Sequence, residues 1–373
     1  MISYIYIENF KVFTRGELNL APLTLLTGLN GMGKTTFIQS LLLLRQSYEK
    51  KSLPDEGLLL NGDYVEIGKG KDAYCMDGVG EHIRFEIEWQ GDKCGEAVFD
   101  FSYATESDVQ PIKSFRPSEN FDPFSTSLFN KNFQYLTAER ITPRTQFPIS
   151  EYRVKQLHAL GNKGEYTVHF IAAYQRSDVF IENLIHPAAK TRAFLAQLDS
   201  WMKEIAPGIS INAEVHSSLN MAKLGYKFEV SRGFTDEFNP VNVGFGITYA
   251  LPVVTAILSS KPGDLLIIEN PESHLHPAGQ AVIGKLCALA AGSGVQIILE
   301  SHSDHILNSI RVAVRNEIIS PELTAVYYFE RDPNADKHKV DIIKPIIDEN
   351  GRIDKKPTGF FDEWTKQLDQ LIS

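Results

Sequence analysis

The segment from Leu23 to Ser40, LTLLTGLNGMGKTTFIQS, constrains the fold of this chain more than any other stretch. Residues 23–26 are largely apolar and predict a buried strand, while the apolar spacing after Thr35 predicts a helix. Between them, Gly28 to Thr35 matches G-x-x-x-x-G-K-[ST], the pattern of a loop that wraps around phosphate groups. Its glycines let backbone N–H groups converge on one anion, and the helix N-terminus adds a partial positive charge. The segment therefore predicts a nucleoside triphosphate site.

The side chains of this loop extend the prediction to a metal ion. Lys34 can reach the β- and γ-phosphates, and the hydroxyl of Thr35 can bind Mg²⁺. The predicted nucleotide-binding residues here are Asn30, Gly31, Met32, Gly33, Lys34, Thr35 and Thr36.

A second apolar strand, from Asp264 to Ile268, ends in the acidic sequence Glu269-Asn270-Pro271-Glu272. In proteins with a phosphate loop, such a strand lies beside the loop and its terminal carboxylate reaches Mg²⁺. Glu269 is therefore predicted to share the magnesium ion with Thr35. The alternative is a buried strand followed by an ordinary acidic turn.

A third apolar strand, Val295 to Leu299, is followed by Glu300-Ser301-His302-Ser303. Side chains at the carboxyl end of such a strand face the ligand crevice of an α/β sheet, so His302 is predicted to sense the γ-phosphate or the attacking water. Ser303 is also suited to cap a following helix, and both roles can coexist. A competing hypothesis is a transition-metal cluster, although its spacing matches no common zinc pattern. That cluster would comprise Glu272, His274, His276, His302, Asp304 and His305.

Composition narrows the class of protein. The 373 residues predict two or three structural units, and 43% hydrophobic residues suffice for a core. Three cysteines without a C-x-x-C pair argue against a disulfide framework and against a zinc site. The start of the chain does not resemble a signal peptide, and the longest apolar run is too short to span a membrane. We therefore expect a cytoplasmic protein without membrane contact.

The net charge of −10 excludes a surface that is basic overall, so contact with DNA or RNA would need a local basic patch. One window, residues 140–163, has five basic residues against the single acid Glu151. Its basic residues are Arg140, Arg144, Arg153, Lys155 and Lys163.

The remaining patterns predict the order of elements. Alternating residues between 65 and 103 predict antiparallel strands, whereas residues 104–131 show no period and are expected to form a long surface loop. Residues 168–203 have a helical pattern, with a break at His186-Pro187. From Asp264 onward, strands alternate with helices, which predicts an α/β fold.

At this point the arrangement resembles the ABC-type ATPases of the RecF, SMC and OLD group. The opening segment Ile5 to Phe13, followed by the phosphate loop, resembles the start of such proteins. Glu269 to Pro277 is similar to their Walker B strand and adjoining loop, and Glu300 to Ser303 to their switch histidine. Asn242 to Gly246 resembles their signature segment, in which Gly244 and Gly246 would contact nucleotide.

Two further blocks resemble compact bacterial members of the group. Tyr135 to Arg144 is similar to a block of that subfamily. Lys356 to Trp364 resembles the C-terminal module DUF3696, of the kind found in anti-phage defence systems.

The resemblance implies a P-loop NTPase fold: an ABC-type ATPase head with a mixed central sheet, an antiparallel β subdomain and a helical lobe. It implies ATP and Mg²⁺ as ligands and a head-to-tail homodimer with two ATP molecules between the heads. Four parts are expected. These are an N-terminal ATPase lobe (1–135), a helical lobe (136–240), a C-terminal ATPase lobe (241–320) and a DUF3696-like module (321–373).

The chain departs from the group at Glu269-Asn270, where relatives commonly have Asp-Glu. An asparagine cannot act as a general base, so either Glu272 activates water or turnover is slow. The predicted catalytic positions are accordingly Glu272, Asn270 and His302.

Three functions are consistent with these residues. The first is an ATP-controlled dimeric switch for a separately encoded effector, a nuclease or toxin, in anti-phage defence; this rests on family analogy. The second is a RecF-like repair ATPase that binds DNA directly through the basic window. The third is an ATP-bound scaffold that does not hydrolyse, which Asn270 suggests.

Overall fold

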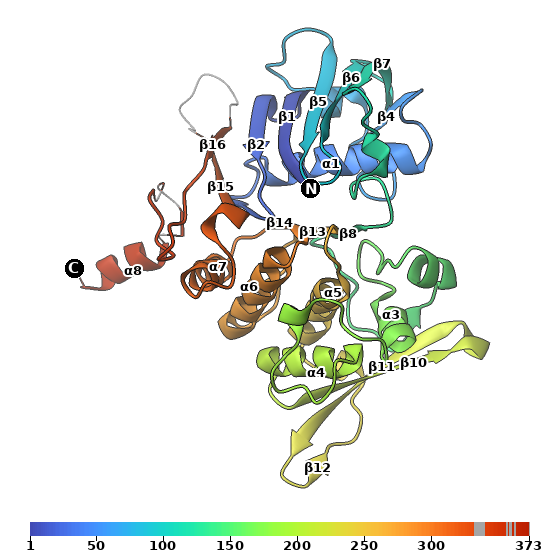
Figure 1. The fold of residues 1–373 in the computed structure, drawn as a ribbon, viewed down its shortest axis with the longest axis vertical. Coiled ribbons are helices and arrows are strands. Elements are labelled where there is room, and N and C mark those ends of the chain that lie inside the picture. The colour runs from blue at the N-terminus through green and yellow to red at the C-terminus, as the bar shows by residue number, and fades with distance from the viewer. Residues whose placement is uncertain (332–339, 356, 358–359, 362, 373) are drawn as a thin grey trace. The chain divides into compact units, whose positions relative to one another are not determined.

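The computed structural model describes residues 1–331, 340–355, 357, 360–361 and 363–372. It divides into two compact units (Figure 1). The first comprises Met1–Asn132, Thr324–Ile346 and Ile353–Ser373, and the second comprises Phe133–Leu323 and Ile347–Arg352. The four-part division expected from the sequence stays a prediction.

The first unit contains a six-stranded antiparallel sheet in the order β2-β1-β5-β6-β7-β4. In β5, inward and outward residues alternate as the sequence predicts, and Phe10 packs edge-on against Phe85 at 5.4 Å between ring centroids. The strands are β1 (Ile2–Phe10), β2 (Phe13–Asn19), β4 (Gly57–Leu59), β5 (His82–Trp89), β6 (Gly95–Ser102) and β7 (Val109–Pro117).

The expected surface loop over residues 104–131 is wrong in part. β7 forms within it and pairs with β6 on one side and β4 on the other. Two prolines, Pro111 and Pro117, obscure the strand pattern in the sequence, and the ladders on both sides compensate for the missing N–H groups. Leu128 and Phe129 from the same segment are buried.

The phosphate-loop segment has the predicted strand–loop–helix structure. β3 (Leu23–Gly28) is buried along its whole length and leads into α1 (Lys34–Glu49), which lies against the antiparallel sheet (Figure 1). β3 pairs in parallel with β15 (Thr324–Glu330), and β15 pairs antiparallel with β16 (Asp341–Ile343). The chain therefore returns to the first unit about 300 residues after leaving β3.

The first unit also contains two shorter helices, α2 (Gly70–Ala73) and the final helix α8 (Glu363–Ile372). The sequence predicted that the last helix begins at Gly359, and that residue lies outside the described part of the chain.

The second unit is built on three buried parallel strands with β13 (Leu265–Glu269) between β8 (Phe133–Leu136) and β14 (Gln296–Glu300). Their consecutive apolar residues are typical of strands covered on both faces. The helices of this half are α5 (Phe245–Ser259), α6 (Pro277–Gly292) and α7 (Asp304–Arg315), and α6 packs on α7. The predicted alternation of strand and helix is confirmed here.

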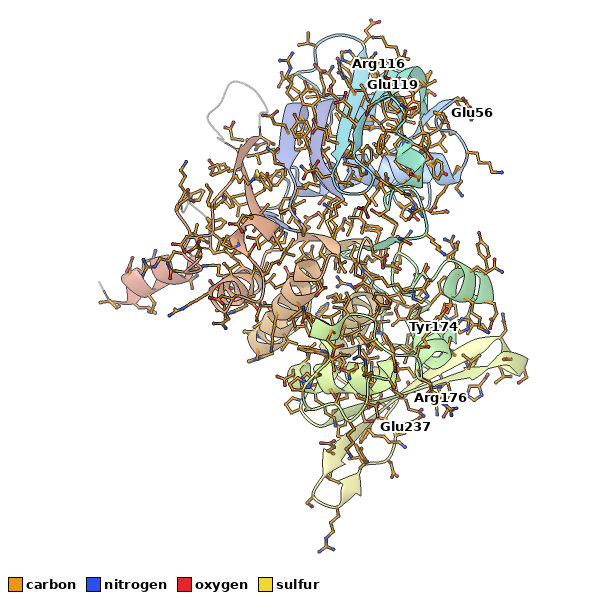
Figure 2. The ribbon with its side chains drawn as sticks, viewed as in Figure 1. Glu56, Arg116, Glu119, Tyr174, Arg176 and Glu237 are labelled. Carbon is orange, nitrogen blue, oxygen red and sulfur yellow. The ribbon has the colours of Figure 1, made fainter. Side chains whose placement is uncertain are left out.

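The rest of the second unit combines helices with a long hairpin. The helical pattern of residues 168–203 corresponds to two helices, α3 (Thr167–Tyr174) and α4 (Phe194–Ile205). β10 (Ile209–His216) and β11 (Met221–Val230) form the hairpin, which β9 (Phe147–Pro148) and β12 (Gly233–Phe234) extend. Glu237, in the segment after β12 (Figure 2), ties that segment to the hairpin. Its carboxylate accepts from the side-chain amide of Asn212 at 2.8 Å and pairs with Lys223 at 2.9 Å. Among the described helices, none has the length and apolarity needed to cross a bilayer.

Candidate functional site

The phosphate loop curls through glycines in the left-handed region. Gly31 has φ of 76° and Gly33 has φ of 95°, values that residues with a side chain rarely adopt. Gly33 precedes the first helical residue, Lys34, so the turn delivers the chain directly into α1. Asn30, Gly31 and Thr35 are exposed on this turn, which leaves its outer face accessible to an anion.

Lys34 lies across this turn with only 3% of its surface exposed. Its ammonium group donates to the carbonyl oxygens of Gly28 at 3.0 Å and Leu29 at 2.8 Å. A buried ammonium group forms stronger hydrogen bonds with charged acceptors, such as phosphate oxygens, than with neutral carbonyls. The loop is therefore suited to bind phosphate groups.

In the second unit, Glu269 occupies the end of β13 and is 6% exposed. One carboxylate oxygen accepts from the hydroxyl of Tyr135 at 3.0 Å, and the other accepts from the N–H of Ala138 at 3.2 Å. Burial raises the pKa of Glu269, whereas these two donors and the charge of Arg140 lower it. A carboxylate that is oriented but deprived of water is stabilised by a nearby cation, so its surroundings fit the predicted role towards Mg²⁺.

The residue after Glu269 has an unusual backbone. Asn270 has φ of 43°, and its N–H donates to the carbonyl of Glu300 at 2.8 Å. Asparagine is among the few residues with a side chain that tolerate this left-handed conformation. This gives a conformational reason for the asparagine at this position.

Glu272 and the backbone of His302 come together in this unit. One carboxylate oxygen of Glu272 accepts from the N–H of His302 at 2.8 Å. Its other oxygen is buried, and within the described residues it has no hydrogen-bond partner. Such an acceptor is costly unless a water or a ligand satisfies it. Of the three predicted catalytic positions, Glu272 is the one with a carboxylate, and that carboxylate has an unsatisfied acceptor oxygen.

The segment around His302 also has the predicted capping role. Ser303 is the N-cap of α7, and its hydroxyl accepts from the N–H of Ile306 at 3.2 Å. The side chain of His302 is exposed. Its predicted role as a sensor of phosphate or water stays a prediction.

The signature segment lies at the start of α5 and contacts the loop that carries Glu272. A methyl group added at Gly246 would overlap the carbonyl oxygen of His274, whereas one added at Gly244 would meet no atom within 4 Å. The ring of His274 packs edge-on against Tyr249 at 4.8 Å between centroids. Phe245 is 49% exposed. The predicted nucleotide contacts of the two glycines are untested, but the structure gives Gly246 a packing role.

The competing hypothesis of a transition-metal cluster finds no support in the geometry. In the part of the chain that the structure describes, no group of three or more His, Cys, Asp or Glu side chains is placed to hold a metal ion. Two of its members have local partners: His276 accepts from the N–H of Ala278 at 3.3 Å, and His305 lies 3.5 Å from Asp304.

The structure removes Arg140 from the exposed cationic patch that the sequence suggested and pairs two other members of the basic window with acids. Arg140 is 2% exposed, so its place in a nucleic-acid surface was wrong. Lys155 pairs with Glu151 at 2.6 Å, and Lys163 pairs with Glu139 at 3.0 Å.

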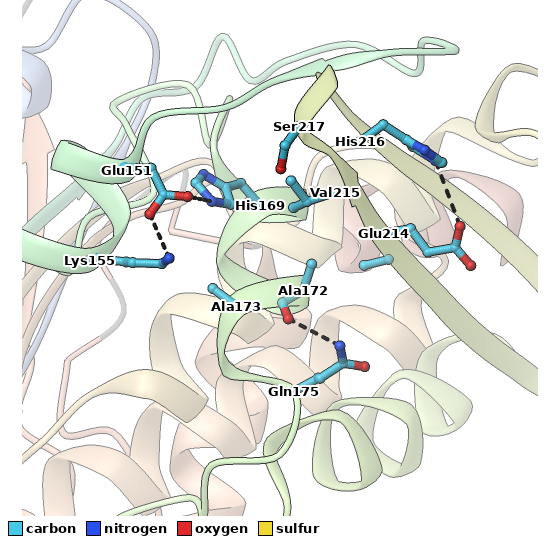
Figure 3. A pocket seen from close by; sticks show the side chains of 11 residues that line it. Glu151, Lys155, His169, Ala172, Ala173, Gln175, Glu214, Val215, His216 and Ser217 are labelled. Carbon is cyan, nitrogen blue, oxygen red and sulfur yellow. Dashed lines mark hydrogen bonds and ion pairs between the residues drawn. The ribbon is translucent and has the colours of Figure 1, made fainter. Parts of the chain in front are cut away.

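Lys155 and Glu151 instead border a pocket of about 560 Å³ in the second unit (Figure 3). His169 of α3 faces them: its Nδ1 accepts from the N–H of Ser150 at 3.1 Å, and its Nε2 lies 3.5 Å from Glu151. The opposite wall comes from the end of β10. Paired charges of both signs at this rim do not make an anion-binding surface.

Arg140 is the site residue that sequence reasoning assigned to the wrong role. Its guanidinium donates to the carbonyl oxygen of Asn270 at 3.1 Å and to that of Glu269. Burial lowers its pKa to about 10, although Glu272 and Glu269 raise it. One feature of the sequence could have indicated this role: Arg140 follows the buried end of β8 by four residues, and ligand crevices begin at such strand ends.

A family model described as "AAA domain, putative AbiEii toxin, Type IV TA system" matches residues 23–308. The chain belongs to this family. A second model, "Protein of unknown function (DUF3696)", matches residues 319–371, so the DUF3696 module predicted from the tail is confirmed. A search of curated proteins found none that matches this AAA protein.

Solved structures confirm the fold class. A crystal structure of the Smc head bound to the C-winged helix domain of ScpA has a TM-score of 0.58 at 11% identity, and the match covers 93% of this chain and 98% of that one. An Smc head domain with an extended coiled coil, bound to the C-terminal domain of ScpA derived from Pyrococcus furiosus, has a TM-score of 0.52 at 11% identity. That match covers 100% of this chain and 99% of that one. The AAA protein therefore has the fold of an ABC-type ATPase head.

Proposed function

We propose that this AAA protein hydrolyses ATP, with Lys34 binding the phosphates and Glu272 activating water. The observation that carries the proposal is the phosphate loop of the first unit. Its left-handed glycines and the buried ammonium of Lys34, which donates to the carbonyl oxygens of Gly28 and Leu29, form a cradle for an anion. The phosphates of ATP offer the same donors charged acceptors, which form stronger hydrogen bonds.

Thr35 and Glu269 would hold Mg²⁺, which, when bound, neutralises charge on the β- and γ-phosphates. Tyr135 and Ala138 fix both oxygens of Glu269, so the carboxylate is oriented before any ligand arrives. Glu272 then takes the proton of the attacking water with its carboxylate. The amide of Asn270 has no basic atom for that step.

The test is steady-state ATP hydrolysis together with ATP titration of the wild type and three variants. Lys34→Ala should lose ATP binding. Glu272→Gln should keep ATP affinity while its kcat falls by about 10²-fold or more, because a positioned base contributes that much. Asn270→Gly, which keeps the left-handed turn without the amide, should hydrolyse at close to the wild-type rate.

A different result would refute each part of this proposal. If the wild type releases no heat on titration with ATP and magnesium, the nucleotide site itself is wrong. If Glu272→Gln turns over like the wild type, Glu272 is not the base. If ATP binds and phosphate release stays at background, the protein is the non-hydrolysing scaffold that Asn270 suggested.

We further propose that a second copy of the chain completes each site. Gly244 precedes α5 in open space, so the first N–H groups of that helix are available to a γ-phosphate held by another protomer. ATP would then stabilise a head-to-tail homodimer, and hydrolysis would weaken it.

The effector is proposed to be a separately encoded nuclease or toxin in anti-phage defence. The support is the description of the family, which names a toxin of a toxin–antitoxin system. The Smc heads of the same fold are also described as bound to a separate protein, ScpA. Co-purification with the products of neighbouring genes should recover the effector. If the protein elutes alone and the neighbouring genes are dispensable for protection, this part fails.

A further inference from the structure

A buried guanidinium is an expensive group to keep in a protein interior, and Arg140 has one next to the proposed reaction centre. Removing a cation from water costs several kcal/mol, and the cost is recovered only through well-formed hydrogen bonds. Arg140 is 2% exposed, and it donates to carbonyl oxygens of the backbone. Its Nε atom is buried and, within the described residues, unpartnered. Packing alone does not account for such a residue.

The two carbonyls that Arg140 binds belong to consecutive residues, Glu269 and Asn270. They lie where the chain leaves β13 and turns into the left-handed conformation of Asn270. The planar guanidinium presents its N–H groups in a fixed fork, so two bonds from one group define the direction of both carbonyls. A lysine ammonium is a single point and cannot fix both directions.

Other hydrogen bonds continue this restraint to Glu272. The N–H of Asn270 donates to Glu300 at 2.8 Å, and that of Ser273 donates back to Asn270 at 3.2 Å. The N–H of Leu275 donates to the backbone carbonyl oxygen of Glu272 at 3.0 Å. The turn between the two acidic residues is therefore held at each end, with Arg140 at its beginning.

We propose that Arg140 is a positioning residue for the ATPase reaction, and that its fork holds the turn that sets Glu269 and Glu272. This inference rests on the proposed function. Arg140 is proposed to contact neither nucleotide nor metal. It acts through the backbone carbonyls of Glu269 and Asn270, so its loss should disturb magnesium-dependent steps and leave the phosphate loop intact.

The experiment compares Arg140→Gln and Arg140→Lys with Arg144→Gln, a nearby exposed arginine, in the full chain. ATP affinity is measured with a fluorescent ATP analogue in EDTA and again in magnesium, and hydrolysis is measured over a range of magnesium concentrations. Affinity in EDTA should be unchanged in all three variants, because the phosphate loop supplies it.

For both Arg140 variants, kcat should fall and the half-saturating magnesium concentration should rise, each by about 10- to 100-fold. This is the usual effect of losing a group that orients a metal ligand. The gain in affinity on adding magnesium should shrink accordingly, and Arg144→Gln should match the wild type.

Each other result is decisive. Wild-type kcat and magnesium dependence in both Arg140 variants would overturn the inference and leave the proposed function intact. Loss of ATP binding in EDTA by both variants would assign Arg140 to the stability of the fold and would also overturn it. If the wild type itself neither binds nor hydrolyses ATP, or if Lys34→Ala hydrolyses it equally well, the proposed function fails instead.

Discussion

At the scale of single residues, backbone conformation explains choices that side-chain chemistry leaves open. Asn270 would be a defect if the position had to supply a general base. Its φ of 43° shows that the position first has to allow a left-handed turn. In the proposed function, the carboxylate chemistry belongs to Glu272, two residues along the chain; its second oxygen is buried and, in the described residues, without a partner.

Gly246 and Gly244 provide a matched pair of glycines on one segment. We expect Gly246→Ala to lower the free energy of unfolding by about 1–3 kcal/mol, because its methyl group would overlap the carbonyl of His274. Gly244→Ala should change it by less than about 0.5 kcal/mol, since the added methyl group enters open space. Urea unfolding of the two variants beside the wild type measures the difference. Equal stability of the two variants would show that α5 does not press on the loop after Glu272.

At the scale of elements, Asp199 joins α4 to β10 and makes their packing sensitive to pH. Its carboxylate accepts from the N–H of Ile211 at 2.8 Å and from the hydroxyl of Ser210 at 3.1 Å. Burial nevertheless raises the pKa of Asp199 from 3.8 to about 6, while these hydrogen bonds lower it. The folded protein therefore binds this proton more tightly than the unfolded chain does.

The sign of the pH effect follows from that difference. The contribution of Asp199 to stability is full below pH 3.8 and is lost as the pH rises through about 6. In Asp199→Asn this loss is absent, so the variant should gain stability relative to the wild type as the pH rises, by at most about 3 kcal/mol. Unfolding in urea from about pH 4 to about pH 7.5 measures it. Asp178→Asn, at an exposed aspartate, is the control, and parallel curves for wild type and Asp199→Asn would refute the prediction.

At the scale of the whole molecule, the proposed reaction draws on both units. Lys34 and Thr35 belong to the first, and Glu269, Glu272 and the signature segment belong to the second. In a head-to-tail dimer, each site would combine the phosphate loop and Glu272 of one protomer with Gly244 of the other. This arrangement makes a prediction about mixtures of inactive variants.

Lys34→Ala and Gly244→Glu should each be inactive alone, the second because a carboxylate would repel the phosphate. Mixed together, they should recover part of the ATPase rate, because one site of the heterodimer has an intact loop and an intact signature. The control is a mixture of Lys34→Ala with Glu272→Gln, which should stay inactive because both residues serve the same half of a site. Recovery in neither mixture would contradict the shared site, and recovery in both would contradict the assignment of halves.

The sequence alone determined the local structures, because each depends on neighbouring residues. The glycines and lysine of the phosphate loop, the apolar strand before Glu269, and the serine cap at Ser303 all form as predicted. Each of these signals lies within about ten residues, where spacing and residue type directly constrain the backbone.

Only the tertiary structure decided which distant residues share a site. Arg140 appeared basic and exposed in the sequence, yet it lies buried against carbonyls 130 residues away. β7 formed in a stretch with no period because two partner strands supply its hydrogen bonds. Burial and pairing across the chain depend on which segments meet, and no local pattern encodes that.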